Sequence, residues 1–85
     1  MLIRFTKAFS KQHDKTSMAI KSAVSRRIQL FSENPFHPQL NNHSLTGKFK
    51  GKRSINITGD WRAIYSENKN AVIFELLGTH SQLYK

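Results

Sequence analysis

The chain has 85 residues, with 14 lysines and arginines against five aspartates and glutamates, so its formal net charge is +9. This length allows a single domain, residues 1–85, without a second hydrophobic core. The chain has no cysteine, which excludes disulfides, thiol catalysis and cysteine-containing zinc sites. The charge is typical of proteins that bind phosphates or an acidic partner; the alternative is a basic protein that is merely soluble.

No segment of the sequence has the character of a signal peptide or a membrane helix. Five charged residues interrupt the first 20 positions, where a signal peptide needs an apolar run. No stretch approaches the roughly 20 apolar residues that a transmembrane helix requires. We therefore expect a soluble, cytoplasmic protein with no membrane partner.

The first half of the chain predicts one strand followed by two helices. Leu2–Phe5 is a short apolar-rich run suited to a strand, and no glycine or proline interrupts the helical pattern of residues 6–34. Asp14 or Thr16 is a candidate cap for the second, longer helix. That helix is expected to end at Asn34, because a proline follows. Its apolar residues recur along one face: Ile20, Val24, Ile28 and Phe31.

The second half predicts a loop and then three strands. Residues 35–47 contain two prolines and several polar amides, which is typical of a loop. Alternating apolar and polar residues predict strands at 54–57 and 61–66, and the apolar run 71–77 is expected to be the buried central strand. The fold class is therefore α+β, in the order β-α-α-β-β-β. Two N-terminal helices would pack on one face of a small, mainly antiparallel sheet.

The bend between the predicted strands 54–57 and 61–66 combines several residue types suited to a functional site. Gly59 can adopt positive φ at little cost. Asp60 and Trp61 follow it, so a carboxylate and an indole lie at the rim of the sheet, where loops carry function. Two histidines, one well before the bend and one well after it, are expected to return to it in the fold: His43 and His80.

Four short segments of the C-terminal half form a recognisable pattern: Asn42–Gly47, Gly51–Arg53, Gly59–Tyr65 and Gly78–Tyr84. In order and spacing they resemble the YafQ branch of the RelE/ParE toxin superfamily, whereas the helical N-terminal half matches only in layout. The resemblance implies a RelE-like fold and the toxin half of a bacterial type II toxin–antitoxin pair. It also implies cleavage of mRNA on the ribosome without metal or cofactor, and silencing by a small cognate antitoxin protein.

The resemblance implies roles for five residues. His43 matches the family histidine ahead of the basic strand, and His80 matches the C-terminal catalytic histidine. Asp60 and Trp61 match the acidic and aromatic pair of the family. Tyr84 matches a terminal aromatic residue, which is phenylalanine in the founding member.

One position departs from the family pattern. The founding member has a further histidine on the strand before the acidic and aromatic pair, and this chain has Asn56 there. An amide cannot exchange protons near neutral pH. If the third histidine is a required acid or base, the departure predicts a less active or inactive enzyme.

The residues themselves suit metal-free RNA cleavage. The 2′-hydroxyl must lose a proton as it attacks the phosphate, and the leaving 5′-oxygen must gain one. Imidazoles suit both transfers because their unperturbed pKa lies near 6.5. We expect His80 to be the general acid or base, with His43 and Asp60 sharing the complementary role. Arg53, a two-pronged donor, is expected to stabilise the phosphorane.

Further residues are expected to bind the RNA substrate or ribosomal RNA. Trp61 and Tyr84 could stack on unpaired bases, each stack being worth roughly 1–3 kcal/mol. A lysine run beside an aromatic residue suits contacts to the phosphate backbone. The predicted substrate-binding residues are Trp61, Tyr84, Lys48, Lys50, Lys52, Arg62 and Asn56.

Each of these roles has a structural alternative. His80 could be a hydrogen-bonded structural histidine, Asp60 could cap the turn, and Trp61 could belong to the core. At the level of the whole protein, the alternatives are a ParE-like toxin that poisons a protein target, and an inactive toxin or plain RNA-binding module on the same fold. None of these needs catalytic histidines.

Overall fold

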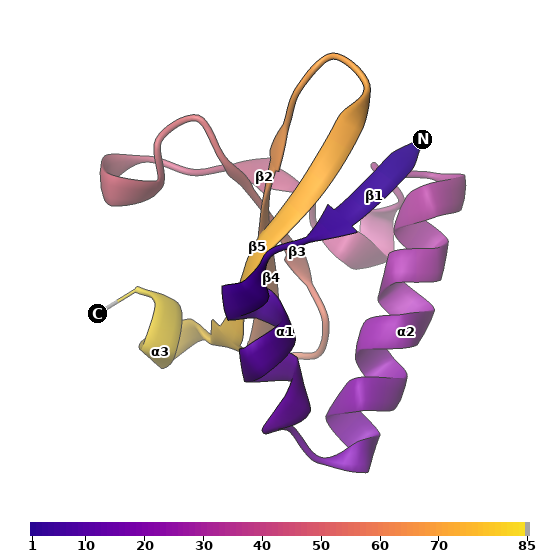
Figure 1. Ribbon diagram of the computed structural model, residues 1–85, viewed down its shortest axis with the longest axis vertical. Coiled ribbons are helices and arrows are strands. Elements are labelled where there is room, and N and C mark those ends of the chain that lie inside the picture. Colours follow the sequence, from indigo (N-terminus) through magenta and orange to yellow (C-terminus); the bar gives the residue numbers. More distant parts are fainter. Residues whose placement is uncertain (85) are drawn as a thin grey trace.

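The computed structural model describes residues 1–84, which form two helices packed on one face of a five-stranded sheet, with a short C-terminal helix beside it (Figure 1). The strand order is β1-β5-β4-β3-β2, and every neighbouring pair is antiparallel except β1 and β5. The predicted α+β class and mainly antiparallel sheet are confirmed. The elements are β1 Leu2–Phe5, α1 Lys7–Asp14, α2 Met18–Glu33, β2 His43–Ser44, β3 Arg53–Asn56, β4 Trp61–Glu67, β5 Ala71–Thr79 and α3 His80–Leu83, with 3₁₀ turns at Pro38–Leu40 and Gly47–Phe49.

Both long helices begin at side-chain caps. Thr6 accepts a hydrogen bond from the backbone N–H of Phe9, and Ser17 accepts one from Ile20, so each first turn has a satisfied donor. The expected cap at Asp14 or Thr16 is wrong, because Ser17 occupies that position. No helix in the described part of the chain has both the length and the apolar character to cross a bilayer.

An aromatic cluster joins the helices to the sheet. Phe31 of α2 lies edge-on to Tyr65 of β4 and to Phe74 of β5, with ring centroids 5.0 and 5.3 Å apart. All three rings are at most 1% exposed. The predicted apolar face of α2 is confirmed: Val24 is buried with Phe31, and Ile20 and Ile28 pack against the same core.

The two faces of the sheet carry different side chains. Residues opposite one another on neighbouring strands share a face, and Ile55, Ala63 and Leu77 are opposite one another in the core beneath the helices. We call this side the helix face. The residues that alternate with these point to the other side, which we call the second face: His43, Ser54, Asn56 and Arg62.

Several short features differ from the sequence expectation. The predicted loop at 35–47 contains a 3₁₀ turn and the two-residue strand β2, and β1 runs parallel to β5. The central strand is β4 rather than β5, since β4 is third in the row of five described strands. Gly59 does not adopt positive φ; that conformation occurs at Gly47, Gly51 and Asn41.

Candidate active site

A cavity of about 380 Å³ lies where β2, the β3–β4 hairpin and α3 meet. It brings together two histidines from distant parts of the chain, an arginine and a tyrosine. Its other lining residues come from the segment around β2. The lining residues are Asn41, His43, Ser44, Leu45, Thr46, Arg62, His80 and Tyr84.

His43 enters the cavity from the edge strand β2. Its Nδ1 donates a hydrogen bond to the backbone carbonyl of Asn41 over 2.8 Å. A carbonyl can only accept, so this bond fixes the proton of the neutral imidazole on Nδ1. The Nε2 atom therefore carries a lone pair and can accept a proton.

His80 lines the cavity as the first residue of α3. Thr79 and Gln82 form a capping box that starts this helix directly after β5. The backbone N–H of His80 donates to the carbonyl of Asp60 over 3.0 Å, which ties α3 to the β3–β4 hairpin. One helical turn later, the ring of Tyr84 lies 4.7 Å from the His80 ring, so the two side chains form one wall of the cavity.

Arg62 supplies the positive charge of the cavity. It lies opposite Asn56 on the second face. Its Nη1 donates to the carbonyls of Thr58 (2.9 Å) and Trp61 (3.1 Å) and is thereby fixed at the hairpin bend. A guanidinium has five N–H donors, so others remain for an anion in the cavity.

Asp60 contacts the site through its backbone. Its side chain is exposed, and within residues 1–84 no hydrogen bond or ion pair joins its carboxylate to either imidazole. The bend is capped by the hydroxyl of Thr58, which accepts from the N–H groups of Asp60 and Trp61 over 3.3 and 3.1 Å. The carboxylate therefore neither caps the turn nor orients a histidine.

Two predicted site residues lie on the helix face instead. Trp61 is opposite Thr79, packs against the core and lines a separate hollow with Leu77 and Leu83. Arg53 is opposite the buried Tyr65, and its side chain contacts the segment after α2, at Phe36 and Asn42. The structure does not bring these two side chains to the histidines, and Arg62 occupies the place that we expected for Arg53.

The predicted lysines divide into two groups. Lys48 and Lys50 are exposed on the loop between β2 and β3, with the Lys48 ammonium 5.1 Å from the ring of Phe49. Phe49 lies edge-on to Tyr84 at 5.9 Å, so this loop borders the cavity wall. Lys52 instead forms an ion pair with Glu75.

Asn56 has an unusual environment. Its Oδ1 is buried and has no hydrogen-bond partner among the described residues, although its cross-strand neighbour Arg62 lines the cavity. A buried acceptor without a partner costs free energy. Asn56 is thus close to the site in the sheet but does not line the cavity itself.

Sequence reasoning missed four cavity residues around β2: Asn41, Ser44, Leu45 and Thr46. Ser44, Leu45 and Thr46 belong to the motif segment Asn42–Gly47, so the motif was the one sequence signal that could have identified them. Asn, Ser, Leu and Thr are common in loops of every kind, so residue type alone does not reveal them.

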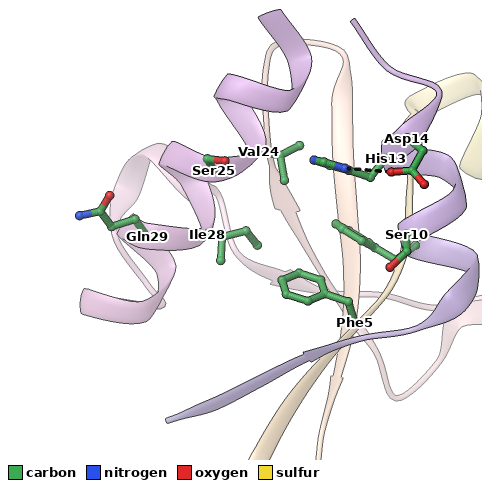
Figure 2. Close-up of a pocket in the computed structure, with 9 residues that line it drawn as sticks. Phe5, Ser10, His13, Asp14, Val24, Ser25, Ile28 and Gln29 are labelled. Atoms are coloured by element: carbon green, nitrogen blue, oxygen red, sulfur yellow. Dashed lines mark ion pairs between the residues drawn. The ribbon is translucent and has the colours of Figure 1, made fainter. Parts of the chain in front are cut away.

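A larger hollow of about 470 Å³ lies between α1 and α2, on the far side of the sheet (Figure 2). Phe5, Val24 and Ile28 point into it. His13 also lines it, and its Nδ1 lies 3.9 Å from Oδ1 of Asp14. None of its nine lining residues, all within the described chain, is a lysine or arginine. This hollow offers no positive charge to a phosphate, so the cavity of His43 and His80 is the candidate active site. In residues 1–84, no three His, Cys, Asp or Glu side chains are grouped as metal ligands usually are.

Two helices on one face of a mainly antiparallel sheet, with a cavity of histidine, arginine and tyrosine at its end, define the class of RelE/ParE-like toxins. The model of the YafQ family, described as the bacterial toxin of a type II toxin–antitoxin system, matches residues 1–85. The chain belongs to this family.

Solved structures agree with this assignment. YafQ from Escherichia coli strain BL21(DE3) is 26% identical with a TM-score of 0.77, covering 98% of this chain and 97% of that one. A copper-bound mutant toxin from Helicobacter pylori is 27% identical with a TM-score of 0.75 and 99% of both chains covered. The E. coli DinJ–YafQ complex is 25% identical with a TM-score of 0.70, covering 98% of this chain and 97% of that chain. A comparison with curated proteins gave no significant match.

Proposed function

We propose that this toxin is a ribosome-dependent mRNA endonuclease that cleaves by attack of the 2′-hydroxyl on the adjacent phosphate. The observation that carries the proposal is the shared cavity: two imidazoles from opposite ends of the second half of the chain, with a guanidinium beside them. This set supplies a proton acceptor, a proton donor and a positive charge, which are the parts that the reaction needs.

The tautomer of His43 suggests how the roles divide. His43 Nε2 accepts the proton of the 2′-hydroxyl, and the 2′-oxygen bonds to phosphorus. His80, protonated, gives its proton to the leaving 5′-oxygen as the phosphorus–oxygen bond breaks. Arg62 takes over the role expected of Arg53 and stabilises the additional charge on the phosphorane. The products are a 2′,3′-cyclic phosphate and a 5′-hydroxyl.

Substrate binding involves the cavity wall and the loop beside it. Tyr84 offers a ring face for an unpaired base, and the exposed Lys48 and Lys50 follow the backbone of mRNA or ribosomal RNA. Trp61, on the helix face, stabilises the fold instead of binding the base. Asp60 holds α3 to the hairpin through its carbonyl.

A cognate antitoxin is the proposed protein partner. The structure of E. coli YafQ bound to DinJ shows that a neighbour of this chain forms such a complex. The net charge of +9 favours an acidic partner segment. With the ribosome as its site of action, the protein works in the cytoplasm.

Replacement of the proposed acid tests the function. We expect His80→Ala to lower cleavage of mRNA on purified ribosomes by roughly 10²–10⁴-fold, with an unchanged circular dichroism spectrum, because the His80 side chain is exposed. Primer extension measures the new 5′ ends. His13→Ala, which removes a histidine on the far side of the sheet, should cleave like the wild type. Wild-type cleavage by His80→Ala would remove this residue from the mechanism.

Asn56 favours one alternative, a toxin on the same scaffold that binds its target without cutting RNA. The amide in place of a family histidine cannot transfer protons near neutral pH. Expression of the wild-type chain distinguishes the two functions. Growth arrest without new 5′ ends in cellular mRNA would support the alternative, and arrest with such ends supports the nuclease.

A further inference from the structure

The strand that carries His43 is too short to hold it firmly. β2 consists of His43 and Ser44 and pairs with β3 at these two positions, at the edge of the sheet. Both residues are exposed. Two ladder positions on an edge restrain a backbone weakly, so the orientation of the His43 ring must depend on other contacts.

The first of these contacts is the preceding backbone turn. Asn41 has φ 45° and ψ 48°, the left-handed conformation that asparagine tolerates better than most residues. Its N–H closes the 3₁₀ turn by donating to the carbonyl of Pro38, and its own carbonyl accepts from His43 Nδ1. The tautomer of His43 therefore depends on where this one carbonyl points.

The second contact is the side-chain amide of Asn42, which ties the same segment to three others. Its Nδ2 donates to the Tyr65 hydroxyl over 2.7 Å and to the carbonyl of Pro35 over 2.9 Å. Its Oδ1 accepts from Arg53 Nε over 2.8 Å. Asn42, which lies between Asn41 and His43, thereby links this part of the chain to β4, to β3 and to Pro35, just after α2.

The partners of Asn42 are themselves fixed. Tyr65 is 1% exposed and belongs to the aromatic core, and burial raises the pKa of its hydroxyl, which keeps it neutral at physiological pH. The guanidinium of Arg53 lies 5.4 Å from the ring of Phe36. Tyr65 therefore anchors the amide in the core, whereas Arg53 holds it from a half-buried position against the exposed ring of Phe36.

We propose that Asn42, anchored by Tyr65 and Arg53, is the positioning residue that keeps His43 in its Nδ1–H tautomer and directs Nε2 into the cavity. This rests on the proposed function for the catalytic consequence, but not for the effect on the ring. It also gives Arg53 and Tyr65 a role in the site, although neither lines the cavity.

Loss of the Asn42 contacts is expected to slow turnover without weakening substrate binding. When Asn42 loses its anchors, the Asn41 carbonyl is no longer held against Nδ1, and part of the His43 population moves its proton to Nε2. A ring protonated at Nε2 cannot accept the proton of the 2′-hydroxyl. We expect kcat to fall about 10- to 100-fold, by analogy with the loss of an orienting partner of a metal-bound histidine, with KM nearly unchanged.

Two variants of the full chain test it. Tyr65→Phe removes one of the two acceptors of the Asn42 amide and keeps the aromatic core, and Asn42→Ala removes the amide. Nitrogen-15 NMR on histidine-labelled protein reports the tautomer of each imidazole. We expect His43 to be mainly Nδ1–H in the wild type and to gain Nε2–H in both variants, while His80 is unchanged. Asn70→Ala, an exposed turn residue, is the matched control for Asn42→Ala and should leave His43 as it is.

The NMR spectra test the positioning role of Asn42, and the cleavage assay tests the role of His43 as the base, so either claim can be contradicted without the other. If His43 remains Nδ1–H in both variants, the positioning role is wrong, whatever the cleavage rate. If the tautomer changes and kcat does not, Asn42 positions the ring as proposed, and the assignment of His43 as the base is wrong. If Asn42→Ala fails to fold, the spectrum of Tyr65→Phe decides.

Discussion

At the residue scale, the two histidines of the cavity are held by different means. His43 is restrained through its ring, which donates to the carbonyl of Asn41. His80 is restrained through its backbone, which donates to Asp60, while its ring lies against Tyr84. The first arrangement selects a tautomer and the second selects a position. A proton acceptor with a fixed tautomer, His43, and a proton donor with a fixed position, His80, suit the attacking and leaving oxygens of an in-line displacement.

Arg62 is the residue whose charge the proposed reaction needs. We expect Arg62→Gln to lower kcat by roughly 10²–10³-fold, the usual effect of removing one donor from a developing oxyanion. Single-turnover cleavage on programmed ribosomes measures the effect. Arg26→Gln, which makes the same change in charge on the exposed surface of α2, should have little effect. Equal losses in the two variants would show that net charge, and not the cavity, is responsible.

The choice between Arg53 and Arg62 could have been predicted from strand parity. Arg53 has the same parity as Ile55, an apolar core residue, so both point to the helix face. Trp61 and Arg62 are adjacent on β4, so only one of them can face the cavity. The motif segments contain both Arg53 and Arg62, but the two-residue period of the strands decides which arginine lies beside the histidines.

At the element scale, the site depends on the shortest helix. α3 covers His80–Leu83, and its capping box starts it directly after Thr79. Leu83 is buried and anchors it. Gly78 lies beneath, where an added Cβ would come within 3.1 Å of the Gln82 side chain and 3.3 Å of Leu83. The absence of a side chain at Gly78 therefore allows α3 to pack closely against the end of β5.

A pair of glycine substitutions tests this close packing. Gly78→Ala should destabilise the fold by about 1–3 kcal/mol, as overpacking does, and should lower cleavage because α3 carries His80. Gly59→Ala should do neither, since a Cβ there meets no atom within 4 Å and φ is not positive. Thermal unfolding by circular dichroism and the ribosome cleavage assay measure both variants. Full cleavage by Gly78→Ala would contradict the dependence of His80 on α3 packing.

The long elements could be predicted from the sequence and the short ones could not. α2 and the β4–β5 hairpin follow from periodic apolar residues, which extend over enough positions to be recognised. β2 and α3 contain two and four residues, too few for any period. β2 depends on pairing with β3, and α3 on a capping box after a buried strand. Both histidines lie on these short elements, so no periodic pattern predicts that they meet; the support for that expectation came from the family motif.

At the scale of the whole molecule, a chain with 14 cationic and five acidic side chains must limit its own repulsion. Glu75 of β5 contributes by joining two other strands. Its carboxylate pairs with Lys52, just before β3, and accepts a hydrogen bond from Ser66 of β4. Partial burial raises the pKa of Glu75, but the bonds from Lys52 and Ser66 outweigh this and hold the pKa below its ordinary value of 4.5.

This lowered pKa predicts how stability depends on pH. A carboxyl whose pKa is lower in the folded state stabilises the fold above its unfolded pKa, and this contribution disappears as pH falls through the folded value. We expect Glu75→Gln to melt at a lower temperature than the wild type at pH 7, and the two melting temperatures to converge as pH falls below about 4.5. Glu67→Gln, an exposed carboxyl on the same hairpin, should follow the wild type throughout. The difference in melting temperature between Glu75→Gln and the wild type could instead stay constant from pH 7 to about pH 3. That result would mean that the ionised carboxylate is not what holds the three strands together.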